Sequence, residues 1–107
     1  MVIFFETNLK NIFAVQSDED FSNEQISKLE WLFGKSKFLS KNHIKNNFIG
    51  PRAAMVSPWS TNAVEITQNM GINGINRIEK YYLFDDNLID FDPMLNEKFT
   101  ILNQEIF

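Results

Sequence analysis

The sequence contains no cysteine, and this absence excludes several kinds of chemistry. A chain without thiols has no disulfide, no cysteine-ligated zinc and no thiolate nucleophile. His43 is the only histidine, so a zinc site made of several histidines is excluded as well. The absence of cysteine fits a reducing compartment, and we expect the protein to be cytoplasmic.

Long apolar runs and clusters of basic residues are also missing. No stretch approaches the roughly 20 apolar residues that a membrane-spanning helix needs. The segment MVIFFETNLK lacks the basic start and the apolar length of a signal peptide, so we expect none. The net charge is −4 with both signs interspersed, which argues against nucleic-acid binding. We therefore expect neither a membrane nor a nucleic acid among the partners.

Sequence motifs for nucleotides and metals do not occur either. No G-x-x-x-x-G-K-[ST] loop is present, and Gly71 and Gly74 are interpreted as turn residues. The aspartates of segment 85–92 lack the spacing of an EF-hand loop and are interpreted as a solvated acidic loop. We therefore expect no cofactor and no metal in this chain.

The sequence does contain enough apolar material for one folded domain. Its 107 residues fall within the usual size of a single domain, and 44% of them are hydrophobic. Eleven phenylalanines supply large side chains for a core. We interpret residues 1–107 as one domain.

Two segments carry start and stop signals for a helix. Ser22 and Gln25 form a capping box that predicts a helix near 22–33. A serine followed by a proline predicts a second helix near 58–70. A glycine follows each segment, where a left-handed C-terminal cap is expected. The second helix carries an apolar stripe made of Trp59, Ala63, Ile66 and Met70.

Several β-prone runs predict strands. Val2–Phe5 and Ile12–Val15 are expected to form a hairpin, and Ile75–Phe84 is the longest candidate strand. Phe48–Val56 reads as extended, and Pro51 within it favours an edge position or a bulge. These features together predict an α+β fold, in which helices pack on one face of an antiparallel sheet.

The remaining segments lead to two further expectations. The order strand, capped helix, glycine, strand occurs at 12–39 and again at 53–84, which predicts two pseudo-repeated halves. Segment 86–107 is interpreted as an acidic loop followed by a C-terminal helical tail, because apolar residues at 95, 99, 102 and 106 have helical spacing. We expect this tail to lead towards a further domain and to be loosely held if the chain ends at residue 107.

The densest motif lies within residues 50–80. It reads G-P-R from Gly50, S-P-W-S-T-N-A-V-E-I from Ser57 and N-x-G-I-N-x-I-N-R-I-E-K from Asn69. These residues resemble the N-terminal domain of phosphoribosylformylglycinamidine synthase, the large single-chain glutamine amidotransferase of purine biosynthesis. The D-P-M segment at 92–94 is similar to a later part of that domain.

The resemblance implies a parent enzyme that uses ATP, magnesium and glutamine-derived ammonia to convert formylglycinamide ribonucleotide to formylglycinamidine ribonucleotide, on the way to IMP. It implies that this chain docks between the synthetase and glutaminase domains, with a fold like a fused dimer of the small separate subunit of the split enzyme. The glutaminase chemistry needs an activated thiolate, which this chain lacks. We therefore assign no catalytic residue and expect the isolated chain to be inactive.

The start of the second helix supplies the candidate contacts with substrate or with neighbouring domains. A helix N-terminus can bind an anion, and a preceding arginine can assist it. The simpler interpretation is that the serine only caps the helix, the arginine pairs with an acidic residue and the tryptophan belongs to the core. The candidates are Arg52, Ser57, Trp59, Ser60 and Thr61.

Two classes other than an enzyme domain fit the same composition. One is a free-standing α+β protein-interaction module without catalytic activity. The other is an RNA-binding α+β module, which is disfavoured because basic residues do not alternate with aromatic ones on the candidate strands. The fold alone does not separate these classes, whereas the reading frame beyond Phe107 does.

Overall fold

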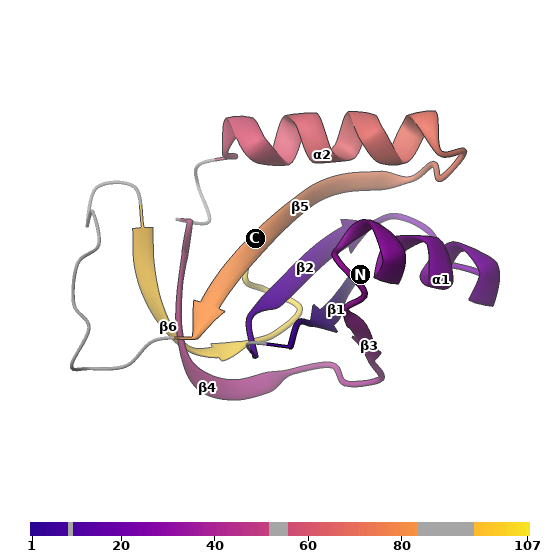
Figure 1. The fold of residues 1–107 in the computed structure, drawn as a ribbon. Helices are drawn as coiled ribbons and strands as arrows, with labels where there is room; N and C mark the ends of the chain where they lie inside the picture. Colours follow the sequence, from indigo (N-terminus) through magenta and orange to yellow (C-terminus); the bar gives the residue numbers. More distant parts are fainter. Residues whose placement is uncertain (9, 52–55, 84–95) are drawn as a thin grey trace.

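The described part of the chain folds into one six-stranded antiparallel sheet with two helices, which confirms the α+β prediction (Figure 1). The computed structural model describes residues 1–8, 10–51, 56–83 and 96–107. The strand order across the sheet is β3-β1-β2-β5-β4-β6. The strands are β1 (Val2–Glu6), β2 (Ile12–Ser17), β3 (Lys37–Leu39), β4 (Ile44–Pro51), β5 (Ile75–Leu83) and β6 (Asn96–Leu102), and the helices are α1 (Asn23–Leu32) and α2 (Pro58–Asn69).

Both predicted helices are confirmed, together with their caps. In α1 the Ser22 side chain accepts from the Gln25 backbone N–H and the Gln25 side chain accepts from the Ser22 N–H, which completes the capping box. Gly34 and Gly71 follow the two helices with φ of 72° and 81°, a region that favours glycine. After α2, the N–H of Ile72 donates to the Thr67 carbonyl at 2.9 Å, which closes the last turn.

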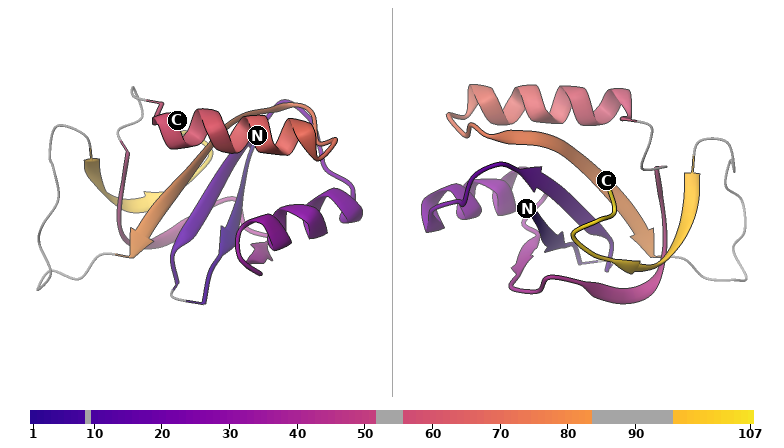
Figure 2. Two further views of the ribbon diagram at one scale, coloured as in Figure 1. Left: turned by 45° about the horizontal axis from the view of Figure 1, so that its top comes forward. Right: turned by 180° about the vertical axis from the view of Figure 1, so that it is seen from behind.

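Side chains along the strands alternate between two apolar clusters, one on each face of the sheet. Phe5 and Phe13 point to the face that carries the helices, whereas Phe4 and Ile12 point to the opposite face. Residues of both α1 and α2 belong to the first cluster, so the two helices cover the same face of the sheet. Figure 2 shows α2 lying along β5 from two further directions.

The C-terminal segment differs from its prediction. Residues 96–102 form strand β6, paired with β4, and not a helix. Segment 99–102 reads F-T-I-L, and its aromatic and β-branched residues suit a strand; β4 offers a free side for pairing. The tail is also firmly held, since Leu102 and Ile106 are buried and Gln104 Nε2 donates to the Val2 carbonyl at 2.7 Å.

Strand β4 also departs from the expectation for its proline. It begins at Ile44 and lies between β5 and β6, so it is not an edge strand. Pro51 is its last residue and pairs only with β6, so the missing N–H interrupts no pairing with β5. The register with β6 shifts between Lys45 and Phe48, several residues before the proline.

Two expectations remain open. The pseudo-repeat between segments 12–39 and 53–84 stays a prediction, because residues 53–55 and 84 fall outside the described residues. The acidic loop 85–92 also lies outside the described residues.

Candidate functional site

The N-terminus of α2 is capped by Ser57, as the simpler interpretation predicted. Ser57 is extended, with φ −70° and ψ 151°, and its Oγ accepts a hydrogen bond from the Ser60 N–H at 3.0 Å. Pro58 occupies the first turn, where a backbone N–H would have no acceptor within the helix, so the lack of one costs nothing.

A carboxylate of the chain itself occupies the anion-binding position at this helix start. Ser57 donates twice to Glu79, from Oγ to Oε1 at 2.6 Å and from its backbone N–H to Oε2 at 3.2 Å. Arg77 Nε donates to the same Oε2 at 3.0 Å, and the two side chains are only 6% and 1% exposed. Glu79 of the same chain therefore supplies the negative charge that the positive end of the helix favours.

Among the described candidates, Ser60 and Thr61 do not face a common polar pocket with Ser57. Ser60 is fully buried, and its Oγ accepts the N–H of Ile78 in β5 at 3.0 Å. Thr61 is exposed, on the helix surface. Arg52 lies outside the described residues.

The apolar stripe of α2 is also placed differently from its prediction. Trp59 and Ile66 are 46% and 47% exposed, so the interpretation of Trp59 as a core residue is wrong. The helix instead buries its small side chains against β5, because β4 pairs with that strand only near its end and leaves room for a close approach. The buried residues of α2 are Ser60, Ala63 and Thr67.

Glycine at position 50 is explained by packing. A β-carbon there would lie 2.5 Å from Cε1 of Tyr81 and closer still to Cδ1, so only a glycine leaves room for the ring. Tyr81 is fully buried, and its hydroxyl has no hydrogen-bond partner within the described part of the chain. Burial raises the pKa of the Tyr81 phenol well above its usual range, so this side chain stays neutral.

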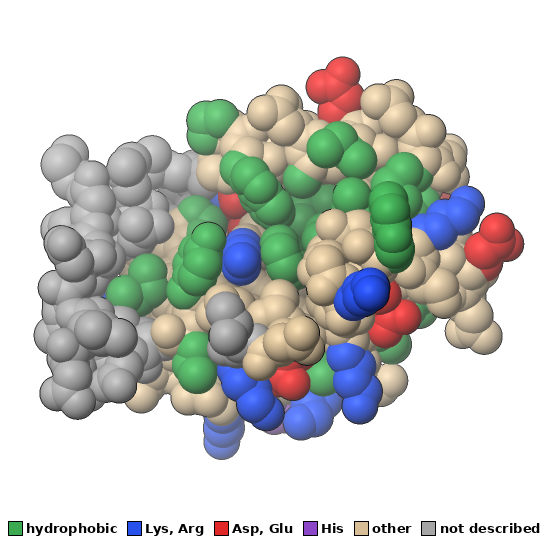
Figure 3. Space-filling model, in the orientation of Figure 1, with side chains coloured by type: hydrophobic (Ala, Val, Ile, Leu, Met, Phe, Trp, Pro, Cys, Tyr) green, Lys and Arg blue, Asp and Glu red, His purple; other side chains and the backbone are tan. Residues whose placement is uncertain are grey.

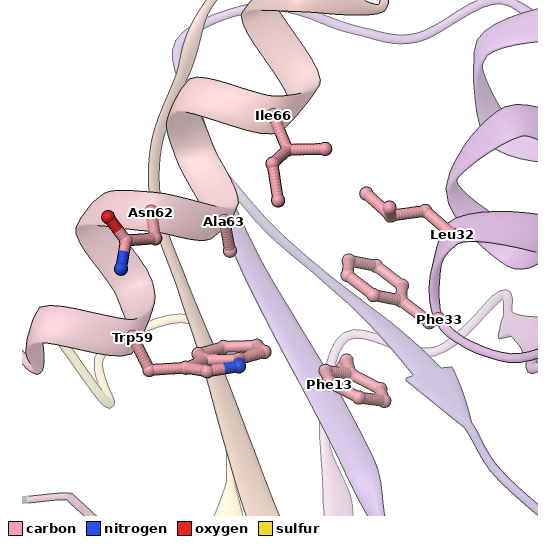
Figure 4. A pocket seen from close by; sticks show the side chains of 7 residues that line it. All are labelled: Phe13, Leu32, Phe33, Trp59, Asn62, Ala63 and Ile66. Atoms are coloured by element: carbon pink, nitrogen blue, oxygen red, sulfur yellow. The ribbon is translucent and has the colours of Figure 1, made fainter.

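Two hollows adjoin the exposed ring of Trp59. One, of about 190 Å³, lies at the start of α2, where Lys80 and two residues of the 50–80 motif, Gly50 and Ser57, line it. The other is an apolar groove of about 350 Å³ between α1 and α2, seen from close by in Figure 4. The residues that line this groove are Phe13, Leu32, Phe33, Trp59, Asn62, Ala63 and Ile66.

Ser60 therefore yields a prediction about stability. Replacement of Ser60 by alanine leaves the buried Ile78 N–H without its acceptor, and we expect a loss of about 1–3 kcal/mol. Urea unfolding of the chain measures this loss. Thr61→Ala, one residue along on the exposed surface, is the matched control and should change stability little. Equal stability of the two variants would contradict the role assigned to Ser60.

Other site classes find no support in the described residues. Within residues 1–8, 10–51, 56–83 and 96–107, no three His, Cys, Asp or Glu side chains are grouped so as to hold a metal ion. None of the described helices has the length and apolar character needed to cross a membrane.

Comparison with known proteins shows the family. The family described as formylglycinamide ribonucleotide amidotransferase N-terminal matches residues 10–103, and the chain belongs to it. The chain is 25% identical over 111 aligned residues to the probable phosphoribosylformylglycinamidine synthase, chloroplastic/mitochondrial, of Arabidopsis thaliana. That alignment covers 82% of this chain but 8% of the plant protein. No solved structure matches the chain.

The buried pair of Arg77 and Glu79 is the part of this site that the sequence did not predict. A signal was present, because the two opposite charges lie on one face of the longest strand, between Ile75 and Tyr81. Ser57, the partner of Glu79, lies 22 residues away in the sequence, so the pattern of residues along β5 gave no indication of this contact.

Proposed function

We propose that this chain is the N-terminal docking domain of a phosphoribosylformylglycinamidine synthase. The parent enzyme would convert formylglycinamide ribonucleotide, glutamine and ATP to formylglycinamidine ribonucleotide in IMP biosynthesis, in the cytoplasm. The observation that carries this proposal is the family match over residues 10–103, which includes the whole of α2 and its capping network. Because the chain spans only 8% of the plant relative, the chemistry belongs to the remainder of the parent.

The contacts of the S-P-W-S motif support a structural role within that enzyme. Ser57 and Ser60 are both engaged in holding α2 against β5, and the helix N-terminus is already neutralised by Glu79. A substrate phosphate would have to displace this buried carboxylate to bind there. The domain would dock between the synthetase and glutaminase domains and help to shape the substrate site and the ammonia path, while ATP and magnesium bind elsewhere in the parent.

A free-standing protein-interaction module is the second candidate function. The observation that favours it is the apolar groove beside Trp59, which would serve a separate protein as well as a neighbouring domain. The reading frame that follows Phe107 separates the two: a continuation that encodes synthetase and glutaminase domains supports the docking domain, and an immediate stop codon supports the module.

The isolated chain should be catalytically silent. It has no cysteine to release ammonia from glutamine and no phosphate-binding loop for ATP. Incubation of the purified chain with glutamine, ATP, magnesium and formylglycinamide ribonucleotide should give no formylglycinamidine ribonucleotide, whereas the parent enzyme under the same conditions should give it. Turnover by the chain alone would refute the proposed division of labour.

A further inference from the structure

The groove between α1 and α2 leaves large apolar side chains in contact with water. Trp59 and Ile66 are each nearly half exposed, and the rings of Phe13 and Phe33 stack at 4.4 Å beneath them. Figure 3 shows hydrophobic side chains gathered on this face, with a basic side chain among them. Burial of apolar surface contributes about 25 cal/mol per Å², so a segment that covers these side chains would gain free energy from the contact.

The walls of the groove determine which kind of segment fits it. They are the sides of two helices, whose backbone N–H and C=O groups are already bonded within each helix. A strand would find no free edge to pair with here, so recognition must come from side chains. An amphipathic helix that lays apolar residues into the groove satisfies this requirement.

One cation beside the groove adds a charge requirement. Lys80 Nζ lies 5.3 Å from the centre of the Phe13 ring and 4.9 Å from that of Tyr82, which holds it beside the groove. Among the described residues no carboxylate lies within salt-bridge distance of this ammonium group. An occupant with an acidic side chain next to Phe13 would pair with Lys80.

The size of the groove favours an occupant tethered to the chain over a separate protein. In a stable complex between two proteins, each partner usually contributes about 20–30 residues to the interface. Only seven of the described residues line this groove, which is a small part of such an interface. A segment of the same polypeptide needs less contact, because its effective concentration is high.

From these observations, and resting on the proposed function, we propose that the α1–α2 groove binds an amphipathic helix of the parent polypeptide, with apolar residues over Trp59 and Ile66 and a carboxylate at Lys80. This contact would fix the orientation of the domain on the rest of the enzyme.

Thiol labelling tests the proposal directly, because the chain has no cysteine of its own. Ile66→Cys places a thiol in the groove, and Gln68→Cys places the matched control on another exposed face of α2. In the isolated chain both thiols should react readily with N-ethylmaleimide. In the parent polypeptide, with sites followed by peptide mass mapping, the thiol at 66 should react about tenfold or more slowly, since it reacts only when the groove opens. The thiol at 68 should keep its rate.

The charge requirement is tested by Lys80→Glu combined with Ile66→Cys. The ratio of labelling rates between parent and isolated chain should fall back towards one, because like charges now face each other, whereas Lys80→Arg should retain the protection. Unprotected Ile66→Cys in the parent would overturn the proposed contact, and protection unaffected by Lys80→Glu would overturn an acidic occupant.

These results are separable from the proposed function. If the parent enzyme needs the domain for turnover but leaves the thiol at 66 fully reactive, the proposed docking function stands and the groove as its contact surface is refuted. A reading frame without synthetase and glutaminase domains would refute the proposed function itself.

Discussion

Replacement of Glu79 by glutamine should destabilise the chain by about 3–5 kcal/mol, the usual cost of removing one partner from a buried ion pair. The carboxylate is 1% exposed and accepts from Arg77 Nε and from two donors of Ser57. Its loss leaves the buried Arg77 charge without this counter-ion and weakens the N-cap of α2. A loss of this size is a large part of the roughly 5–15 kcal/mol that stabilises a typical domain. Urea unfolding followed by circular dichroism measures it.

Glu24→Gln is the matched control for this prediction. Glu24 pairs with Lys28 at 3.8 Å on the surface of α1, with its side chain 83% exposed, so its loss should change stability little. If the glutamine variants at 79 and 24 unfold at the same urea concentration, the buried network does not stabilise the fold as described.

Replacement of Gly50 by alanine should cost about 1–3 kcal/mol, because the new β-carbon overlaps the ring of Tyr81. The same substitution in a Tyr81→Leu background should cost less, since the ring is gone. Tyr81→Phe is the control for the hydroxyl and should be nearly neutral, because that group has no partner within the described residues. The unmodified chain, Gly50→Ala, Tyr81→Leu and the double variant form a double-mutant cycle in unfolding experiments, and strict additivity would contradict the packing explanation.

Local signals allowed the sequence to predict much of the fold. The capping box at Ser22, the serine–proline start of α2 and the two closing glycines are decided within a few residues, and the structure confirms all of them. The β1–β2 hairpin and the span of β5 were predicted for the same reason. The prediction for segment 96–102 was wrong because pairing with the free side of β4 outweighed the helical spacing of its apolar residues.

The site was predictable only in part, since its contacts join distant segments. The cap at Ser57 is local and was predicted, whereas its bonds to Glu79 depend on how α2 lies beside β5. Trp59 was expected in the core because it is aromatic and lies on the apolar stripe. The close approach of α2 to β5 requires small side chains, so the serine, alanine and threonine of the helix are buried in its place.

The most direct test of the account removes residues 1–107 from the parent enzyme and measures glutamine-dependent formation of formylglycinamidine ribonucleotide. We expect the truncated enzyme to lose most of its turnover and to regain it when the purified chain is added in excess, because the domain contributes docking and no chemical step. A truncated enzyme with full turnover would contradict this account.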